Sequence, residues 1–367
     1  MRMFKKFLFC TSIFILGAIA VRAQSSFFKA DSNAQWISMD LHIHTVFSDG
    51  AVWPSIRVEE ARREGLDLIA MTEHLEYQPH AEDLPHPDRN RSFYIASEMI
   101  NPEERLQVIN GSEITREMPP GHINAVFVKD ANKLLHKDSL TGIQEANKQN
   151  AFVFWNHPNW DAHRIDGIAR LEPFHNFLIS NKLLHGIEVV NETTFSEEAL
   201  QIALDNDLTI LGTSDIHGLT DWAHEISEGG HRPMTFVRVN GKSVEAIKKA
   251  LFSGNTIVWY EDLVIGKEDQ IKQLVSENIR FGTPTYPEDK LILQLDVVNE
   301  SSVPFQMEYL GEYSFHQGSS IFILEPKTTT RIQIKTGTKE ENLTLPFRIL
   351  NALIGPKKFL EHEFLVK

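Results

Sequence analysis

Two histidines and an aspartate lie close together where a short apolar segment gives way to a turn. His42 and His44 are two residues apart in a segment with the period of a β-strand, so both imidazoles project from the same face. Asp49 follows in the turn. Two imidazoles that project together from a strand end can bind the same metal ion. Such a pair is also a common accident of sequence, so it does not identify a metal site alone.

Side chains of the same kinds recur at five further places along the chain, each beside a predicted strand. Together with the first group they make nine candidate metal ligands: His42, His44, Asp49, His74, Glu113, His122, His157, Asp215 and His217. In parallel β/α folds, the carboxyl ends of the strands form one face, where side chains far apart in the sequence converge. We therefore expect these nine side chains to form a metal centre and not to be isolated core residues.

The segments that would hold these side chains alternate between strand and helix patterns. Strands are predicted at residues 37–43, 67–71, 107–110, 124–128, 152–155, 186–190, 209–211 and 234–239, and helices at residues 55–64, 93–99, 141–149, 196–204 and 244–252. Alternation at this spacing predicts a parallel β/α architecture over residues 36–266, either a barrel or an open sheet.

The pattern changes after residue 266. One more helix is predicted at residues 269–277, and residues 281–287 contain two prolines, as a linker does. Half-buried strands, in which apolar and polar side chains alternate, are predicted at residues 291–298, 331–335 and 359–366. We therefore predict a second, all-β domain with a small sandwich fold at residues 285–367.

The composition is that of an ordinary globular protein with one exception. The chain has 367 residues, and 50 acidic against 36 basic side chains give it a formal charge of −14. Such a chain lacks the basic surface that duplex binding requires, so we expect no nucleic-acid partner. A single cysteine excludes an intramolecular disulfide framework and a cysteine-rich zinc site. Histidine is the exception, because fourteen of the sixteen histidines lie between His42 and His231.

The first 23 residues have the pattern of a cleaved signal peptide. Basic residues near the start precede an apolar segment at residues 7–20, and small residues follow it. The apolar segment is shorter than the roughly 20 residues that span a bilayer, so we expect no stable membrane anchor. Removal of residues 1–23 deletes four basic residues and no acids, which takes the formal charge from −14 to −18. The sequence thus predicts a periplasmic or secreted protein, and it makes no prediction about the oligomeric state.

The ligand pattern resembles that of the PHP (polymerase and histidinol phosphatase) metallohydrolase family over about residues 36–260, since every motif occurs in the order that the family has. Within that family, four segments are similar to the exported Sb-PDE-type phosphodiesterases, which act on organophosphate diesters. These segments are VWPSIRVEE at 52–60, EYQPH at 76–80, EITR at 113–116 and PPGH at 119–122. The resemblance implies a distorted β/α barrel that holds two or three divalent metal ions.

The resemblance also implies how the nine side chains divide among the ions. His42, His44, Glu113 and Asp215 would hold the first ion, Glu113 would bridge to a second that is also held by His122 and His157, and Asp49, His74 and His217 would hold a third. One position departs from the family, because Glu73 stands where the family usually has aspartate. Since this residue precedes a ligand, we expect the change to alter the support of the third site and not the number of ligands.

The side chains themselves predict the kind of metal and of reaction. Six imidazoles and three carboxylates with no thiolate suit Mn²⁺, Zn²⁺ or Fe²⁺ better than softer ions. Two such ions about 4 Å apart can ionise a shared water near neutral pH and bind the attacking and leaving oxygens of a phosphoester. We therefore predict a phosphoric ester hydrolase in which a metal-bound hydroxide attacks in line, and the resemblance to the Sb-PDE type implies small organic phosphate diesters as its substrates. Asp215 would serve as a ligand, and it can also orient the nucleophile or receive its proton.

A phosphoester site also needs a cation for the charge that develops on the phosphate, and arginine matches phosphate oxygens with two hydrogen bonds. Arg232 is the first candidate and Arg116 the second, and a surface salt bridge is the alternative for both. His231 is a candidate general acid for the leaving alkoxide. Glu188 and Asn191, at the end of a predicted strand, either support the site or form its polar rim.

Two alternatives to a phosphodiesterase are a phosphomonoesterase and a binding protein. A monoesterase of the histidinol-phosphatase kind would use the same ligands, although export argues against a role in amino-acid biosynthesis, which is cytoplasmic. A non-catalytic binding protein would use the metals for stability and the β domain for recognition of a surface partner. Trp53, Trp155 and Trp160 lie near ligand motifs, where they form either an aromatic wall for an ester group or ordinary core packing.

Overall fold

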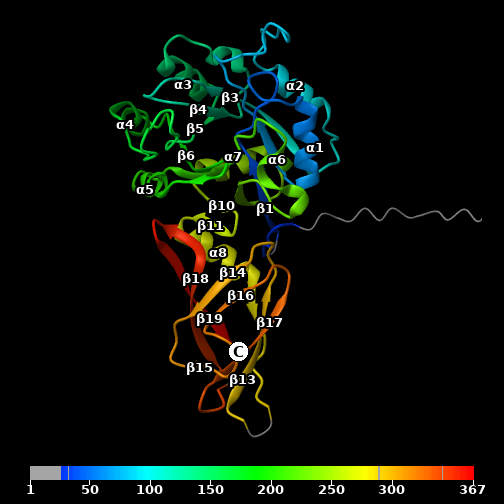
Figure 1. Cartoon of the computed structure of the whole chain (residues 1–367), viewed down its shortest axis with the longest axis vertical. Coiled ribbons are helices and arrows are strands. Elements are labelled where there is room, and N and C mark those ends of the chain that lie inside the picture. Colours follow the sequence, from blue (N-terminus) through cyan, green and yellow to red (C-terminus); the bar gives the residue numbers. More distant parts are fainter. Residues whose placement is uncertain (1–25, 32, 288–289, 341) are drawn as a thin grey trace, which may run out of the picture.

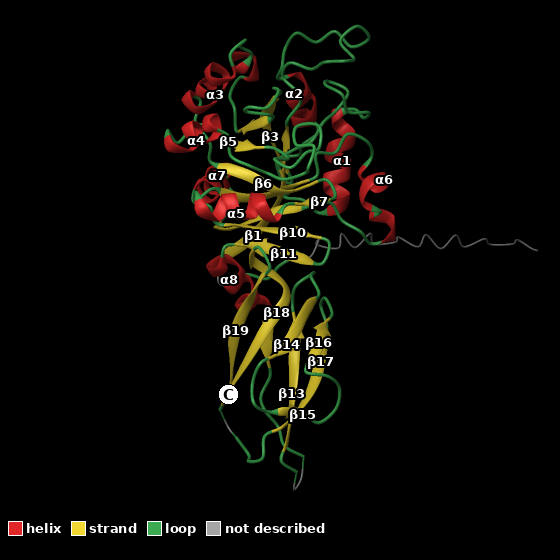
Figure 2. Ribbon diagram, turned by 60° about the vertical axis from the view of Figure 1, so that its left-hand side comes forward, coloured by secondary structure: helices red, strands yellow, loops and turns green. Residues whose placement is uncertain are grey.

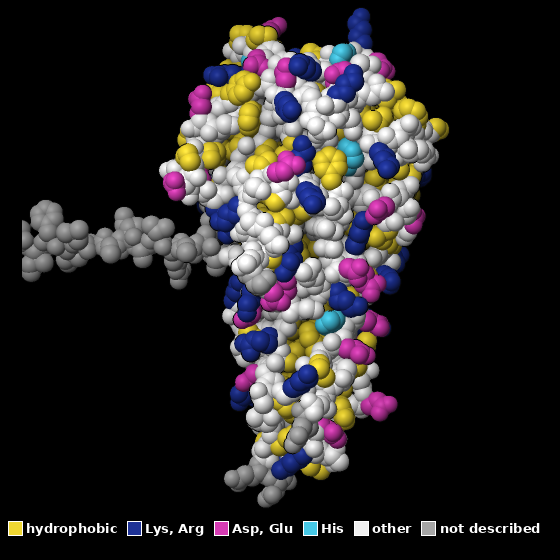
Figure 3. Space-filling model, turned by 180° about the vertical axis from the view of Figure 1, so that it is seen from behind, with side chains coloured by type: hydrophobic (Ala, Val, Ile, Leu, Met, Phe, Trp, Pro, Cys, Tyr) yellow, Lys and Arg dark blue, Asp and Glu magenta, His cyan; other side chains and the backbone are white. Residues whose placement is uncertain are grey.

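The computed structural model describes residues 26–31, 33–287, 290–340 and 342–367, and the predicted signal peptide lies outside these ranges. The molecule has two lobes, one below the other along its long axis (Figure 1). The upper lobe is a sheet surrounded by helices, and the lower lobe is made of strands (Figure 2). On the back of the molecule, basic and acidic side chains are interspersed over both lobes (Figure 3). No helix in the described ranges is both long and apolar enough to cross a bilayer.

The strands of the upper lobe follow the apolar segments of the sequence. Most of their residues are buried, because helices or other strands cover both faces. The strands are β1 (Ala34–Asp40), β2 (Leu68–Met71), β3 (Gln107–Ile114), β4 (Ile123–Val126), β5 (Phe152–Trp155), β6 (Gly186–Asn191), β7 (Thr194–Phe195), β8 (Thr209–Thr213), β9 (Met234–Asn240), β10 (Thr256–Tyr260) and β11 (Leu263–Gly266).

The sheet of the upper lobe mixes parallel and antiparallel pairs. β2 is parallel to both β1 and β3, and β6 is parallel to both β5 and β8. β4 is antiparallel to both β3 and β5, and β9 is antiparallel to β1 and β10. The reversal at β4 follows from its connection to β3, which contains no helix to return the chain to the other end of the sheet. The predicted β/α barrel is confirmed in a distorted form, in which the parallel order holds for only some of the strands.

β8 closes the barrel through side chains as well as through its ladder with β6. The Thr235 hydroxyl in β9 donates to the Gly212 carbonyl and accepts the Gly212 N–H, at 2.8 and 2.9 Å. The Thr256 hydroxyl in β10 donates to another β8 carbonyl at 2.7 Å. A bridge between Ile43 and Ile216 joins the segments that follow β1 and β8. The ends of these two strands therefore meet, and the residues that follow them come together.

Helices cover the outside of the upper lobe, except for α8 (Glu268–Asn278), which lies where the two lobes meet (Figure 2). The covering helices are α1 (Pro54–Glu64), α2 (Arg91–Glu98), α3 (Ser139–Lys148), α4 (Pro173–Ser180), α5 (Glu197–Asp205), α6 (Thr220–His224) and α7 (Val244–Phe252). α1 begins at a proline, whose fixed φ suits a first helical turn, and ends at Gly65, whose φ of 82° suits a left-handed cap. Ser196 and Ser243 accept backbone N–H groups at the starts of α5 and α7.

The lower lobe is a sandwich of antiparallel sheets, as the sequence predicts. Its strands are β12 (Ile279–Phe281), β13 (Ile292–Asn299), β14 (Phe305–Tyr309), β15 (Ser314–Phe315), β16 (Ile321–Leu324), β17 (Thr329–Lys335), β18 (Leu343–Gly355) and β19 (Lys358–Val366). One sheet has the order β12–β13–β17–β15, and the other joins β16, β14, β18 and β19. Aromatic rings from the two sheets meet in the core, where the ring centroids of Phe281 and Phe347 are 5.7 Å apart.

The long strand β18 joins the two lobes. Its residues Ala352 and Leu353 pair with Val264 and Ile265 of β11, so the sheet of the upper lobe continues into the lower one. One cluster of buried apolar side chains also extends from β1 in the upper lobe to β13, β14 and β18 in the lower lobe. The lobes therefore share a hydrophobic core, which is more than the polar contact of loosely linked domains.

We predict that the two lobes unfold together. All six tryptophans lie before residue 260, so tryptophan fluorescence reports on the upper lobe alone. Truncation of the buried Phe347 to alanine should cost about 3–5 kcal/mol and lower the urea midpoints of tryptophan fluorescence and circular dichroism equally. Leu365→Ala, at a position of β19 that is 58% exposed, should leave both midpoints nearly unchanged. Two separate transitions, with the fluorescence midpoint insensitive to Phe347→Ala, would contradict the shared core.

Candidate metal centre

All nine predicted ligands lie at one end of the barrel. His42, His44 and Asp49 follow β1, His74 follows β2, Glu113 lies near the end of β3, His122 precedes β4, His157 follows β5, and Asp215 and His217 follow β8. The reversed direction of β4 explains how a residue before this strand reaches the same end. Ile123 at its start pairs with Ile114 at the end of β3 and with Trp155 at the end of β5.

The first group of side chains lies around Asp215. Its Oδ1 atom is 3.1 Å from His42 Nε2 and 3.0 Å from His44 Nε2. Carboxylate oxygens of Glu113 are 3.6 Å from the same two nitrogens. All four side chains are buried. The structure therefore brings together the set that the resemblance implies for the first ion.

Glu113 also contacts the two histidines implied for the second ion. Its Oε1 atom is 2.9 Å from His122 Nδ1 and 3.5 Å from His157 Nε2. The Asn156 amide donates to the same oxygen at 2.8 Å, which fixes the carboxylate. Glu113 thus lies between the two groups, as a bridging carboxylate must.

The third group lies on the more open side of the cluster. Asp49 Oδ2 is 3.3 Å from His74 Nε2, and Asp49 Oδ1 is 3.2 Å from His217 Nε2. The Asp49 and His217 side chains are 24% and 35% exposed, whereas those of His44 and Glu113 are fully buried. His74 also contacts Glu113, with Nδ1 2.6 Å from Oε2, so the three groups form one continuous cluster.

Unpaired atoms show that this cluster fits a set of metal ligands. Among the described residues, several buried atoms of the cluster lie close to one another but make no contact with hydrogen-bond geometry, namely His42 Nε2, His44 Nε2, Asp49 Oδ1, Glu113 Oε2 and Asp215 Oδ1. A buried polar atom without a partner is costly unless a ligand completes it. Donor atoms lie within 4.8 Å of one another in three sets, which are His44, Asp49, His74 and His217; His42, His44 and Glu113; and His74, Glu113 and His122. Nitrogen and oxygen donors of this kind suit Mn²⁺, Zn²⁺ or Fe²⁺.

Protons balance the charges of the cluster when no cation is bound. Burial disfavours a charged imidazole, and it lowers the pKa of His44 to about 3. At His74, the carboxylates of Glu113 and Asp49 outweigh the cost of burial and raise the pKa to about 10. At His217, burial is outweighed chiefly by Asp49, and the pKa rises to about 9. Burial alone would raise the pKa of Glu113, but the surrounding imidazoles hold it well below its usual value.

Glu188 holds two of the ligand-bearing segments in place. Its carboxylate accepts the Nδ1–H of His42 at 2.8 Å and the backbone N–H of His157 at 2.7 Å. Thr213 and Asn191 donate to the same carboxylate at 2.7 and 2.9 Å. The contact with Nδ1 leaves Nε2 of His42 toward the cluster. Of the two roles open to Glu188 from the sequence, the structure favours support of the site.

Glu73, which departs from the family pattern, supports the turn that carries Asp49. Its carboxylate accepts the Thr45 N–H and the hydroxyls of Thr45 and Ser48, at 3.0, 2.5 and 2.6 Å. Asp49 and His74 still contact each other in the third group. The position is therefore the one expected of a residue that supports this group without binding metal itself.

Arg57 of α1, which the sequence analysis did not single out, ties together the segments that follow β1 and β8. Its side chain is buried and pairs with Glu60 at 2.7 Å. At 2.7–3.0 Å it also donates to four backbone carbonyls of the ligand-bearing segments, those of His44, Ile216, His217 and Gly218. The charge pattern of α1 also suits a solvated helix face, so the sequence carries no signal for this clamp.

The structure corrects the role of Arg232. This buried guanidinium donates to Glu64 at 2.7 and 2.8 Å and to Asp40 at 3.0 Å. Asp40 in turn accepts the N–H and the hydroxyl of Ser214, the residue before a predicted ligand. Arg232 is therefore engaged in a buried ion-pair network and is not free to contact a phosphate. The Glu64 side chain, at the end of α1, is buried for the same reason.

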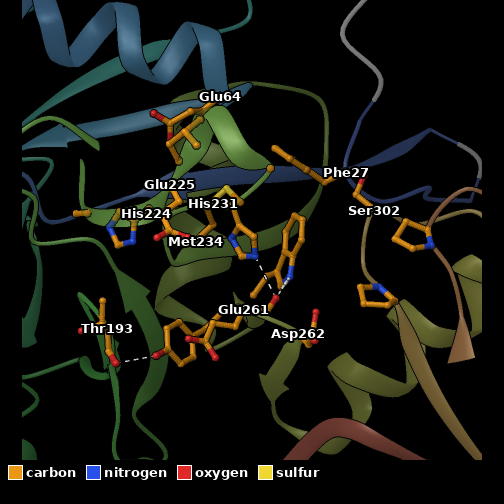
Figure 4. A pocket seen from close by; sticks show the side chains of 18 of the residues that line it. Phe27, Glu64, Thr193, His224, Glu225, His231, Met234, Glu261, Asp262 and Ser302 are labelled. Atoms are coloured by element: carbon orange, nitrogen blue, oxygen red, sulfur yellow. Dashed lines mark hydrogen bonds between the residues drawn. The ribbon is translucent and has the colours of Figure 1, made fainter. Parts of the chain in front are cut away.

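His231 lies outside the cluster, so it is not placed to act as the predicted general acid. Its two ring nitrogens face the carbonyl oxygens of Arg232 and Glu261, 2.8 and 3.0 Å away. The imidazole packs against the Trp259 ring in a pocket of about 780 Å³, which residues of both lobes line (Figure 4). None of the nine predicted ligands, all of which the structure describes, lines this pocket.

Arg116, unlike Arg232, lies beside the cluster. It lines a second pocket, of about 670 Å³, together with the predicted ligand His122. Its guanidinium pairs with Glu76 at 2.7 Å and contacts the His136 carbonyl. The Nε atom is buried without a hydrogen-bond partner in the described part of the chain. Arg116 therefore lies in the same pocket as a predicted ligand, and contact with a phosphate stays a prediction for it.

The three tryptophans near ligand motifs have different environments. Trp155 is a core residue, fully buried and stacked on His175 with ring centroids 4.0 Å apart. Trp53 lines a smaller pocket with Phe47 and His86. Trp160 is 42% exposed and lines the pocket that also contains Arg116.

Metal binding should release protons. Without metal at pH 7, His74 and His217 are protonated, since their pKa values are about 10 and about 9, and both must lose a proton to bind a cation. Titration calorimetry with Mn²⁺ or Zn²⁺ in buffers of different ionisation enthalpy should show the release of at least these two protons. The affinity for metal should fall as the pH is lowered below these values. An affinity that does not change with pH, without proton release, would exclude these imidazoles as ligands.

The structural role of Arg232 predicts a large loss of stability on substitution. Arg232→Met leaves Glu64 and Asp40 buried without their cation, which should lower the free energy of unfolding in urea by about 3–5 kcal/mol. Arg170→Met, in the exposed pair with Asp166, is the matched control and should change stability by less than about 1 kcal/mol. Unchanged stability with weakened phosphate binding would instead restore Arg232 as a substrate contact.

Comparison with known proteins accounts for both lobes. The family model of an Ig-like domain, DUF5001, matches residues 279–365. No curated protein matches the sequence. One solved structure with limited similarity is a candidate metal-dependent phosphoesterase from Bifidobacterium adolescentis, with 17% identity, a TM-score of 0.41, and coverage of 59% of this chain and 96% of its own. Another is an amidohydrolase from Chromobacterium violaceum, with 14% identity, a TM-score of 0.36, and coverage of 49% of this chain and 87% of its own.

A third solved structure matches almost the whole molecule. It is a two-domain protein from Bacteroides vulgatus that contains a predicted PHP-like metal-dependent phosphoesterase. The match covers 94% of this chain and 100% of that chain, with 34% identity and a TM-score of 0.86. The chain therefore belongs to the PHP-like metal-dependent phosphoesterase family, in the two-domain form with a C-terminal Ig-like domain.

Proposed function

We propose that this protein is a phosphodiesterase that hydrolyses small organic phosphate diesters with two or three Mn²⁺, Zn²⁺ or Fe²⁺ ions. The observation that carries the proposal is the cluster of nine histidine, aspartate and glutamate side chains, several of which hold buried donor atoms without a partner. The relative from Bacteroides vulgatus is described as containing a predicted PHP-like metal-dependent phosphoesterase, which supports a phosphoester as the substrate.

The charge of the neighbouring pocket favours a diester over a monoester. The pocket beside His122 has two cationic side chains, Arg116 and Lys137, and two acidic ones, Glu117 and Asp138. A diester carries one negative charge near neutral pH, whereas a monoester approaches two. A pocket with balanced charges suits the singly charged group better.

The sequence supports action outside the cytoplasm. The first 23 residues have the pattern of a signal peptide, and four segments near the predicted ligands are similar to exported phosphodiesterases of the Sb-PDE type. We therefore place the substrate among phosphate diesters that reach the periplasm or the medium.

The residues of the cluster have separable tasks in such a reaction. When bound, two neighbouring ions lower the pKa of a shared water and neutralise charge on the phosphate. Glu113 sets the spacing of the first two groups, because it contacts His42 of one and His122 of the other. Burial raises the pKa of Asp215, but His42 and the other imidazoles lower it below the usual range, so Asp215 acts as a ligand and is a weak base. Arg116, held by Glu76, supplies the cation on the side of His122.

Removal of a ligand should abolish turnover. Metal-depleted protein reloaded with Mn²⁺, Zn²⁺ or Fe²⁺ should release 4-nitrophenol from bis(4-nitrophenyl) phosphate faster than from 4-nitrophenyl phosphate. Glu113→Gln and Asp215→Asn should lower kcat/KM by at least about 100-fold, since even residues that only support ligands contribute up to this factor. Asp296→Asn, in an exposed pair with Arg331 in the lower lobe, should leave kcat/KM unchanged.

The same assay separates the alternatives. Faster turnover of the monoester would favour a phosphomonoesterase. Absence of turnover with every metal, in protein that binds metal, would contradict a catalytic role and favour a binding protein.

A further inference from the structure

The pocket beside His122 presents an aromatic surface that the metal chemistry does not require. Trp160 is 42% exposed and lines this pocket of about 670 Å³. We propose that the pocket binds an ester group with a flat, conjugated ring, which stacks on Trp160. The proposal rests on the proposed phosphodiesterase function and names the class of ester that the same site selects.

Trp160 is held against the predicted ligands. Its ring centroid is 5.4 Å from that of His122 and 5.2 Å from that of His157, with interplanar angles of 54° and 71°. The His163 ring packs against the indole, with ring centroids 4.7 Å apart and an interplanar angle of 73°. The backbone N–H of Trp160 also donates to the His157 carbonyl at 2.9 Å. These contacts fix the indole, so a ring stacked on its open surface would carry its phosphate beside His122 and His157.

The other walls of the pocket offset its two carboxylates, Glu117 and Asp138, with cationic side chains, which suits a singly charged ester. Arg116 lies on the same pocket with a buried, unpartnered Nε atom. Within the described ranges, the Lys137 ammonium has no ion-pair partner. Pro119, Pro120 and Ala162 add apolar surface. A volume of about 670 Å³ is in the range of small-molecule sites, which is roughly 300–1,000 Å³.

The larger pocket between the lobes lacks this combination. Among the described residues, its lining has the carboxylates of Glu225, Glu261 and Asp262 (Figure 4) and of Glu325 but no lysine or arginine, so it would repel a phosphate ester. Its tryptophan, Trp259, is buried against Phe27 and His231, and little of its surface is open to a ligand. An aromatic surface, the unpaired Lys137 ammonium, the Nε atom of Arg116 and a predicted metal ligand therefore meet in the pocket of Trp160.

The test measures binding, so that it does not depend on turnover. Phenylphosphonate and methylphosphonate share a charged head and differ in the ring, and each is titrated into the metal-loaded protein. We expect phenylphosphonate to bind about 5- to 150-fold more tightly, the range for a ring stacked on an aromatic side chain. Trp160→Ala should remove this preference without changing the affinity for methylphosphonate, and Trp160→Phe should retain most of it.

Controls separate a specific from a structural effect. Tyr94→Ala, at an equally exposed aromatic (43%) on α2, should leave both affinities and their ratio unchanged. Metal content and circular dichroism should be the same in all variants. A phenyl-to-methyl ratio that survives Trp160→Ala overturns the inference, even if the protein hydrolyses diesters. Ring-selective binding that depends on Trp160, in a protein that hydrolyses no phosphate ester, would support the pocket and contradict the phosphodiesterase.

Discussion

Three carboxylates and six imidazoles share one end of the barrel, and their charges constrain the structure around them. Carboxylates that are buried together repel one another unless cations balance them. In the metal-free chain the imidazoles supply this balance, which is why burial and the carboxylates act in opposite directions on their pKa values. Divalent ions can replace those protons at the same donor atoms. The site is therefore built around positive charge, which protons on the imidazoles or bound divalent ions can supply.

Residues outside the cluster hold it in place against this repulsion. Arg57 spans the segments after β1 and β8 through four backbone carbonyls, and Glu188 does the same for the segments after β1 and β5. Arg232 joins Asp40 at the end of β1 to Glu64 of α1. Fully buried charged groups are tolerated here because each has a partner of opposite charge or several hydrogen bonds. The residues that hold the cluster in place are thus themselves charged and buried.

The cluster of nine side chains could be predicted from the sequence, whereas the residues that support it could not. Strand ends are marked by apolar segments, and a histidine or carboxylate at such an end has few structural uses, so its type and place carry information. Arg57, Glu60 and Glu64 have the pattern of a solvated helix face, and only tertiary packing buries their side chains. Arg232 does lie at the predicted end of the barrel, but its charge is taken up by Asp40 and Glu64. In the lower lobe, the sequence analysis predicts no strand where β18 runs and joins the upper lobe. This strand contains Pro346, a residue type that disfavours the interior of a sheet.

Anomalous X-ray diffraction from crystals of the metal-loaded protein tests the central claim most directly. Data collected at the Mn or Zn absorption edge should show two or three peaks at the end of the barrel, with Glu113 between the first two and Asp49 in contact with the third where a third is bound. Glu113→Gln crystals should lose occupancy at both peaks that this carboxylate joins. An ordered cluster of the same nine side chains without any anomalous peak at saturating metal would show that these residues do not form a metal centre.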